Sequence, residues 1–196
     1  MYSQIINHKS QTNKGFTLVE MVTAVAIFSI VMVIAMGALL SVLNANKQNQ
    51  AIQTAVNNLN LAMEMMSREI RVGHTYHCGM DGVMTDTRDC ELGEDYIVFE
   101  AFDGNPVDGS DQIIFKLESE RIQRSDDSGA NFLYLTAEDV VLERLIFYVA
   151  GTDIGDNIQP RVLISLSGYV DLGSVGDRGK SHFDLQTTVS QRLIDF

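Results

Sequence analysis

A single carboxylate, Glu20, lies within a largely apolar segment, residues 16–43, that carries no other charged side chain. Burying a lone carboxylate in hydrocarbon costs roughly 2.5–3.5 kcal/mol. The chemistry expected of such a group is therefore to pair with a cation. Because the segment contains no Lys, Arg or His, that cation has to come from elsewhere.

Two cysteines, Cys78 and Cys90, are the next candidates for chemistry. Outside the cytoplasm such a pair most often forms a disulfide, which here would close a short loop. The alternative is a zinc site in which His74 and His77 complete a set of four ligands.

An acidic loop, residues 103–111, is a third candidate. Calcium prefers several oxygen ligands on a tight turn. Four residues of the loop could supply them: Asp103, Asn105, Asp108 and Asp111. The loop does not match the EF-hand spacing, and a solvated acidic turn is the alternative. We expect no cofactor at this loop, with calcium as the alternative.

Composition and the missing motifs exclude other classes of protein. The net charge of −12 argues against nucleic acid as a partner, because phosphate binding needs a basic surface. The chain contains no G-x-S-x-G, no H-E-x-x-H and no phosphate-binding glycine loop. We therefore expect no enzymatic activity.

The apolar segment exceeds the roughly 20 residues that a helix needs to cross a bilayer. Residues 1–15 precede it and carry Lys9 and Lys14 but no acidic residue, which predicts that the N-terminus lies in the cytoplasm. The residues after the segment, which we call the head, would then lie on the opposite side of the membrane. The peptide bond between the small residue Gly15 and Phe16 lies at the start of the segment. Cleavage there would leave the segment in the mature protein, whereas an uncut signal anchor is the alternative.

The helical pattern continues beyond Leu43, which predicts one helix from about Phe16 to Arg71 that stops at Gly73. Its second part is amphipathic, and we also expect Met63, Met65 and Met66 to pack in the core. The predicted apolar stripe consists of Ala45, Ile52, Val56, Leu59, Met63, Met66 and Ile70.

The rest of the chain has the pattern of β-strands separated by polar turns. The predicted strands are 95–102, 112–117, 121–124, 142–149, 161–170 and 183–192. We therefore expect an α+β fold in which an antiparallel sheet packs on the amphipathic part of the long N-terminal helix.

The stretch GFTLVE, from Gly15 to Glu20, follows Lys14 and opens the apolar segment. It resembles the processing site of type IV prepilins and type II secretion pseudopilins. The resemblance implies that prepilin peptidase cuts between Gly15 and Phe16 and methylates the new amine of Phe16. It also implies that Glu20 pairs with the N-terminal amine of a neighbouring subunit during assembly, and that the fold is the pilin fold.

This resemblance implies a division into a leader (1–15), a transmembrane and filament-core helix (16–43), an amphipathic helix (44–72) and a globular head (73–196). The order of the later strands is similar to that of W-type minor pilins and J-type minor pseudopilins, although the apolar segment lacks the proline common in filament pilins. The implied partners are prepilin peptidase, other pilin or pseudopilin subunits, the inner-membrane assembly platform and the lipid bilayer.

The implied location is the inner membrane, crossed once with the head in the periplasm, and then a periplasmic or extracellular filament. Two alternatives remain open at this point. One is a filament-tip adhesin or substrate-binding module that uses calcium. The other is an uncut, membrane-anchored periplasmic domain.

Overall fold

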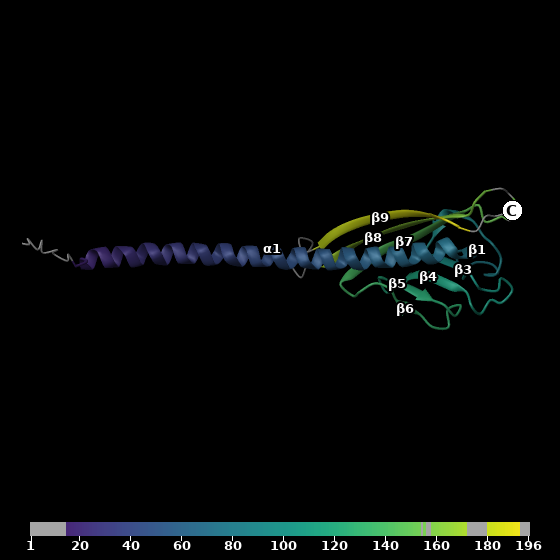
Figure 1. Cartoon of the computed structure of the whole chain (residues 1–196), viewed down its shortest axis with the longest axis horizontal. Coiled ribbons are helices and arrows are strands. Elements are labelled where there is room, and N and C mark those ends of the chain that lie inside the picture. Colours follow the sequence, from purple (N-terminus) through teal and green to yellow (C-terminus); the bar gives the residue numbers. More distant parts are fainter. Residues whose placement is uncertain (1–14, 154, 156–157, 172–179, 193–196) are drawn as a thin grey trace, which may run out of the picture. The chain divides into compact units, whose positions relative to one another are not determined.

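The computed structural model describes residues 15–153, 155, 158–171 and 180–192. One helix, α1, runs from Leu18 to Val72 (Figure 1). Thr17 caps its start, since its Oγ1 accepts a hydrogen bond of 3.3 Å from the Glu20 N–H.

The predicted stop at Gly73 is confirmed. A side chain at Gly73 would come within 2.5 Å of Phe99, so only glycine fits this close approach. The buried Tyr76 hydroxyl lies 2.6 Å from the carbonyl oxygen of Ile70 and 2.8 Å from that of Gly73. It therefore satisfies carbonyl groups that the end of the helix leaves without an intrahelical partner.

The chain divides into two compact units, residues 1–47 and 48–196. In the first unit every described residue is exposed, including Phe16, Leu18 and Phe28. By length and composition, α1 could cross a membrane. An apolar surface of this extent needs lipid or other protein to cover it.

The described part of the second unit forms two antiparallel sheets. Sheet 1 has the order β1-β3-β4-β5-β6, and sheet 2 the order β2-β7-β8-β9. The strands are β1 (His74–Cys78), β2 (Cys90–Glu94), β3 (Tyr96–Glu100), β4 (Ile113–Glu118), β5 (Arg121–Ser125), β6 (Leu133–Tyr134), β7 (Val140–Ala150), β8 (Arg161–Asp171) and β9 (Lys180–Ser190).

The α+β layout is confirmed, and the six predicted strands correspond to β3, β4, β5, β7, β8 and β9. The expectation of a single sheet is wrong, because these strands belong to two sheets. Pattern reasoning also missed β1, β2 and β6. Thr75 in β1 has a φ of 54° and Gly93 in β2 a φ of 82°, so neither strand has the regular backbone that produces an alternating pattern.

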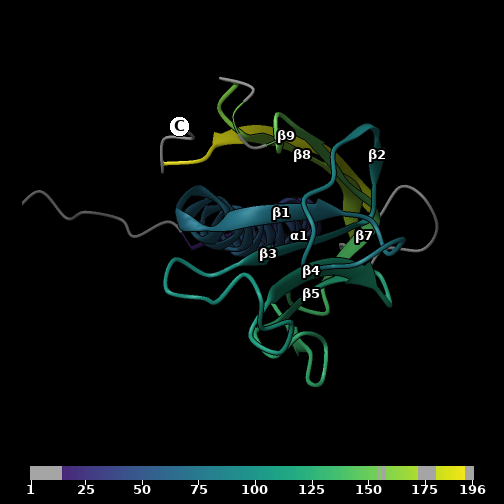
Figure 2. The same cartoon turned by 90° about the vertical axis from the view of Figure 1, so that its right-hand side faces the viewer.

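The C-terminal part of α1 lies between the two sheets (Figure 2). A single core joins all three layers: Leu59, Met66 and Ile70 of α1 cluster with Phe115 of sheet 1 and Phe147 of sheet 2. Each of these side chains is at most 1% exposed. The amphipathic face is therefore covered on both sides.

The predicted stripe needs correction at several positions. Val56 is 46% exposed and Met65 36% exposed, while Ala55 and Ala62 are 2% exposed. Ala45 is exposed as well. The buried face combines these two alanines with Leu59, Met66 and Ile70, because a closely packed interior has room for small side chains at some positions and for large ones at others. The prediction favoured large apolar residues and therefore chose Val56 where the smaller Ala55 is buried.

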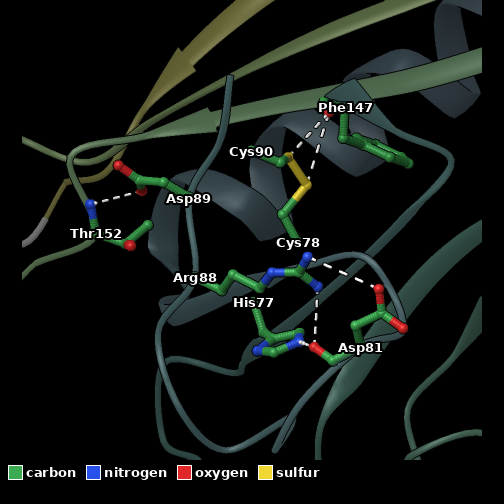
Figure 3. Close-up of a disulfide and its surroundings, with 8 residues drawn as sticks. All are labelled: His77, Cys78, Asp81, Arg88, Asp89, Cys90, Phe147 and Thr152. Carbon is green, nitrogen blue, oxygen red and sulfur yellow. Dashed lines mark hydrogen bonds and ion pairs between the residues drawn. A yellow bond between two sulfur atoms is a disulfide. The ribbon is translucent and has the colours of Figure 1, made fainter. Parts of the chain in front are cut away.

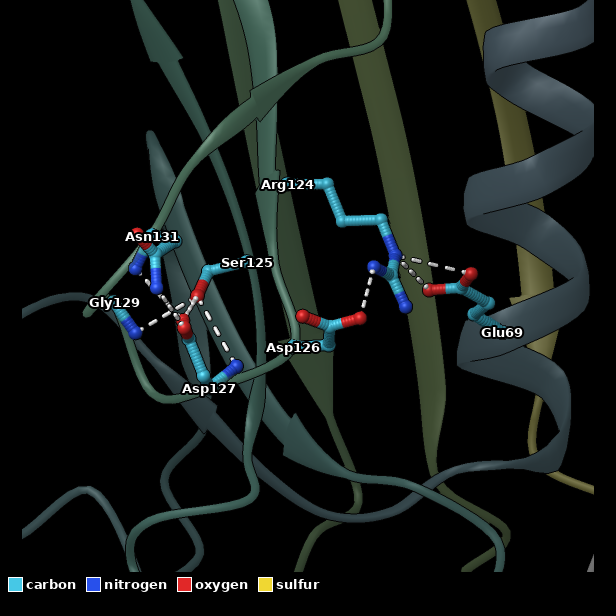
Figure 4. A network of polar contacts seen from close by, with 7 residues as sticks. All are labelled: Glu69, Arg124, Ser125, Asp126, Asp127, Gly129 and Asn131. Carbon is cyan, nitrogen blue, oxygen red and sulfur yellow. Dashed lines mark hydrogen bonds and ion pairs between the residues drawn. The ribbon is translucent and has the colours of Figure 1, made fainter.

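A polar contact fixes sheet 1 against the helix (Figure 4). The Arg124 guanidinium on β5 binds Glu69 of α1 at 2.9 Å and Asp126 at 3.0 Å. Burial alone would lower the pKa of Arg124, but these bonds outweigh it and raise the pKa. Next to it, the hydrogen bond from Ser125 lowers the pKa of Asp127 to about 2 and closes a tight turn.

Leu59 and Leu61 offer a matched test of this core. Leu59 is 1% exposed and Leu61 is 61% exposed on the same helix. Leu59→Ala should lower the free energy of unfolding by about 2–5 kcal/mol, because it removes core contacts and leaves a cavity. Leu61→Ala should change it by less than about 0.5 kcal/mol. Unfolding of the full chain in detergent measures both values, and equal effects would contradict this packing.

Candidate functional site

The N-terminal segment places the predicted cleavage and assembly residues at the start of α1. Gly15 and Phe16 precede the helix, and Phe16 is 78% exposed. Apart from its neighbours in the chain, no described residue has an atom within 4 Å of the place where a side chain on Gly15 would sit. The peptide bond between them is therefore open to an enzyme, whereas Lys14 and the rest of the predicted leader lie outside the described residues.

Glu20 lies in the first turn of α1, where a carboxylate is favoured by the positive end of the helix dipole. The spacing of Thr17 and Glu20 matches a capping box, of which the structure contains one half, the Thr17 cap. Glu20 forms no ion pair with any residue of the described part of the chain. Its carboxylate is thus exposed and available to a cation from outside this part.

Comparison with known proteins gives one match. Residues 10–36 match the family described as the prokaryotic N-terminal methylation motif. The chain carries the N-terminal signal of type IV pilins and pseudopilins. The match spans Gly15, Phe16 and Glu20, and the motif implies processing by prepilin peptidase and assembly with other pilin subunits. No curated protein and no solved structure matches the chain.

The exposed apolar helix and the pilin signal together indicate a membrane-anchored protein. The signal covers only the beginning of the chain, so it leaves the subtype undetermined.

The predicted disulfide between Cys78 and Cys90 is present (Figure 3). It connects β1 of sheet 1 to β2 of sheet 2, with the two Cα atoms 5.8 Å apart. Both sulfurs lie against the carbonyl oxygen of Phe147, at 3.7 and 3.3 Å. The bond therefore joins an edge strand of one sheet covalently to an edge strand of the other.

The zinc alternative at these cysteines is wrong, because their sulfurs are used by the disulfide. His77 is also occupied, since its ring nitrogens lie 2.8 Å from the Asp86 carbonyl oxygen and 2.9 Å from that of Asp81. Arg88 donates to the same Asp81 oxygen at 2.9 Å. The disulfide loop is thus held by side chains at its base (Figure 3).

Three side-chain oxygens of the acidic loop accept hydrogen bonds from the backbone of the loop itself. Asn105 Oδ1 accepts from the Val107 N–H at 3.2 Å, and Asp108 Oδ1 accepts from the Ser110 N–H at 3.1 Å. Asp111 Oδ2 accepts from the Asn105 N–H at 3.3 Å. These contacts are those of a self-capped turn.

No three His, Cys, Asp or Glu side chains come together as a metal site in the described ranges of the chain. Calcium binding by Asp103, Asn105, Asp108 and Asp111 thus stays a prediction. The structure instead places Asp111 beside a carboxylate that sequence reasoning missed, Glu100 at the end of β3. Its only signal in the sequence was its place directly after the apolar run of β3.

Removing the disulfide should destabilise the head. The double variant Cys78→Ser, Cys90→Ser should lose about 3 kcal/mol of unfolding free energy, since the open loop gains conformational entropy in the unfolded chain. The measurement is chemical unfolding of the full chain in detergent, with and without a reductant. The reductant should destabilise the wild type and leave the double variant unchanged, and an unchanged wild type would contradict the structural role.

Proposed function

We propose that this protein is a minor pilin or pseudopilin, a structural subunit of a type IV pilus or a type II secretion pseudopilus, without a reaction of its own. The observation that carries the proposal is that the methylation signal leads directly into a helix whose residues 18–50 are all exposed. This exposed surface is largely apolar. Lipid would cover it before assembly, and the helices of neighbouring subunits would cover it afterwards.

Cleavage after Gly15 would create the cation that Glu20 lacks. The new amine on Phe16 would lie just before the start of α1, and Glu20 lies in the first turn of that helix. An amine at this end is unfavourable next to the helix dipole, so a carboxylate close by stabilises it. In a filament, the amine of a neighbouring subunit could take the same position and favour one axial register.

A minor subunit is favoured over a major one by the sizeable two-sheet head and by the absence of proline from the apolar segment. A minor subunit occurs in few copies, so its head does not have to pack against identical heads along a shaft. The same argument applies to a pilus, a secretion pseudopilus or a DNA-uptake filament. We place the processed protein in the inner membrane, with its head in the periplasm, before assembly.

The mass of the N-terminal peptide tests the processing step. We expect a peptide that starts at Phe16 and is heavier than the unmodified peptide by one methyl group. The sample is the full protein isolated from a membrane that contains prepilin peptidase. An intact N-terminus at Met1 would contradict the proposal and would support the uncut, membrane-anchored domain instead.

Glu20→Gln tests the assembly step because it removes the charge and keeps the size of the side chain. Insertion into the membrane should be unchanged, while incorporation into filaments should fall by at least about tenfold if the ion pair contributes 1.4 kcal/mol or more. The measurement is the amount of subunit in sheared filaments relative to membranes. Glu64→Gln, an exposed change later in the same helix, is the control and should incorporate normally. Normal incorporation of Glu20→Gln would refute the pairing.

A further inference from the structure

Glu100 is a buried carboxylate on the outer face of sheet 1. Successive side chains of a strand point to opposite faces, and Phe99 faces the main core. Glu100 therefore shares a face with Tyr96 and Val98, which form a second, smaller apolar cluster. Met84 of the disulfide loop packs on this cluster, and Glu100 is 0% exposed.

The polar atoms at this place lack ordinary partners. Within the described part of the chain, both carboxyl oxygens of Glu100 and Oδ1 of Asp111 are buried and form no hydrogen bond of ordinary geometry, although Gln112 and Asp111 lie near enough to Glu100 to act on it through hydrogen bonds. Asp111 nevertheless lies close enough to act on Glu100 as a neighbouring carboxyl group. Two carboxylates that are both ionised, buried and adjacent would repel each other and would each lose hydration.

The charged groups around the pair do not supply a counter-ion. From the loop 101–111, Asp108 adds a further negative charge. From β1, His74 is the cross-strand partner of Glu100, but burial lowers the pKa of His74 and so favours its neutral form. Just before β4, the neutral Gln112 amide donates to the Met84 carbonyl oxygen at 2.9 Å and also acts on Glu100 as a hydrogen-bond donor, without supplying a charge. Neither carboxyl of the pair takes part in an ion pair with another described residue.

We propose that Glu100 and Asp111 share one proton, and that this proton holds the loop 101–111 closed against sheet 1. The carboxylic acid of Glu100 would donate to Oδ1 of Asp111, which gives both orphaned groups a partner. Asp111 Oδ2 already accepts from the Asn105 N–H at 3.3 Å, so Asp111 would connect Glu100 to the loop backbone. On deprotonation, the proton passes to water and two adjacent carboxylates remain.

The direction of the pH effect follows from the closed state. Burial raises the pKa of Glu100, and the charges of Asp111 and Asp108 raise it further, against the opposing effect of Gln112. The closed loop therefore binds the proton more tightly than the open loop does. Closure is fully stabilised below the ordinary pKa of a glutamate, and it weakens as the pH rises through the raised pKa of Glu100.

Loss of the proton would change what the head presents to a partner. The loop carries Phe102 and Val107, which are 65% and 88% exposed in the closed form. It also joins β3 to β4 at the centre of sheet 1. Opening would alter a surface next to the sheet while leaving the main core with α1 in place. This device concerns the head alone and does not depend on processing at Gly15.

Hydrogen–deuterium exchange of the loop tests the proposal in the full chain in detergent with a chelator present. After correction for intrinsic exchange rates, the loop-opening equilibrium should rise with pH by up to about tenfold per unit across the titration of the pair. Glu100→Gln should keep the loop closed and remove this pH dependence, since the neutral amide can still donate to Asp111. Asp103→Asn, an exposed acid in the same loop, should behave as the wild type.

Two results would overturn the proposal: a pH-independent loop in the wild type, or an unchanged pH dependence in Glu100→Gln. A third result would also overturn it: calcium in place of the chelator restores the protection of the wild-type loop at high pH but does not restore it in Glu100→Gln. That result would mean that the pair binds a divalent cation. If Glu100→Gln does not fold, infrared difference spectra of the wild type and Asp111→Asn decide between the outcomes. A protonated-carboxyl band in the wild type that shifts in Asp111→Asn supports the shared proton. The absence of such a band in the wild type refutes the shared proton.

Discussion

One helix has to satisfy two environments, and most of the structure follows from that constraint. Residues 15–50 expose their side chains, whereas from Ala55 onward one side of α1 is enclosed by two sheets. A continuous helix pairs its own backbone groups in either environment, so the same element can lie in lipid and in a protein core. Only the side chains have to change, from apolar all round to apolar on one face.

The head is built around the end of this helix. Arg124 ties sheet 1 to Glu69 of α1, and the Arg192 N–H after β9 donates to the Arg71 carbonyl oxygen at 2.8 Å. The disulfide then joins the sheets to each other. Helix, sheet 1 and sheet 2 are thus connected pairwise by polar or covalent contacts in addition to their common core.

The sequence predicted the long helix, its end at Gly73, the disulfide and the longer strands, because each produces a strong local pattern. The two-sheet arrangement was missed because strand periodicity reports which residues alternate and carries no information on which strands pair. Ala55 and Ala62 were missed as core residues because close backbone packing favours small side chains. The function of the start of α1 could be predicted in more detail, since Gly15, Phe16 and Glu20 form a short contiguous motif that can be recognised without tertiary structure.

Glu100 illustrates what local patterns leave out. In the sequence it is one acid among many in an acidic head, whereas in the structure it is fully buried and a side chain on Gly104 of the following loop would come within 2.8 Å of its carboxyl group. Asp111 is eleven residues away and becomes its neighbour only when the loop folds back. Interactions that depend on such tertiary closure can be derived only from coordinates.

The short connection after α1 also has a mechanical meaning. A pull along the helix reaches the head through the packed residues of α1 and also through Gly73, where the Tyr76 hydroxyl and the first strand follow within a few residues. At Cys78 the tension divides, because the covalent bond to Cys90 passes part of it directly to sheet 2. The disulfide therefore prevents residues 79–89 from being extended when force is applied. Such a connection lets a head bear tension at its base without unravelling strand by strand.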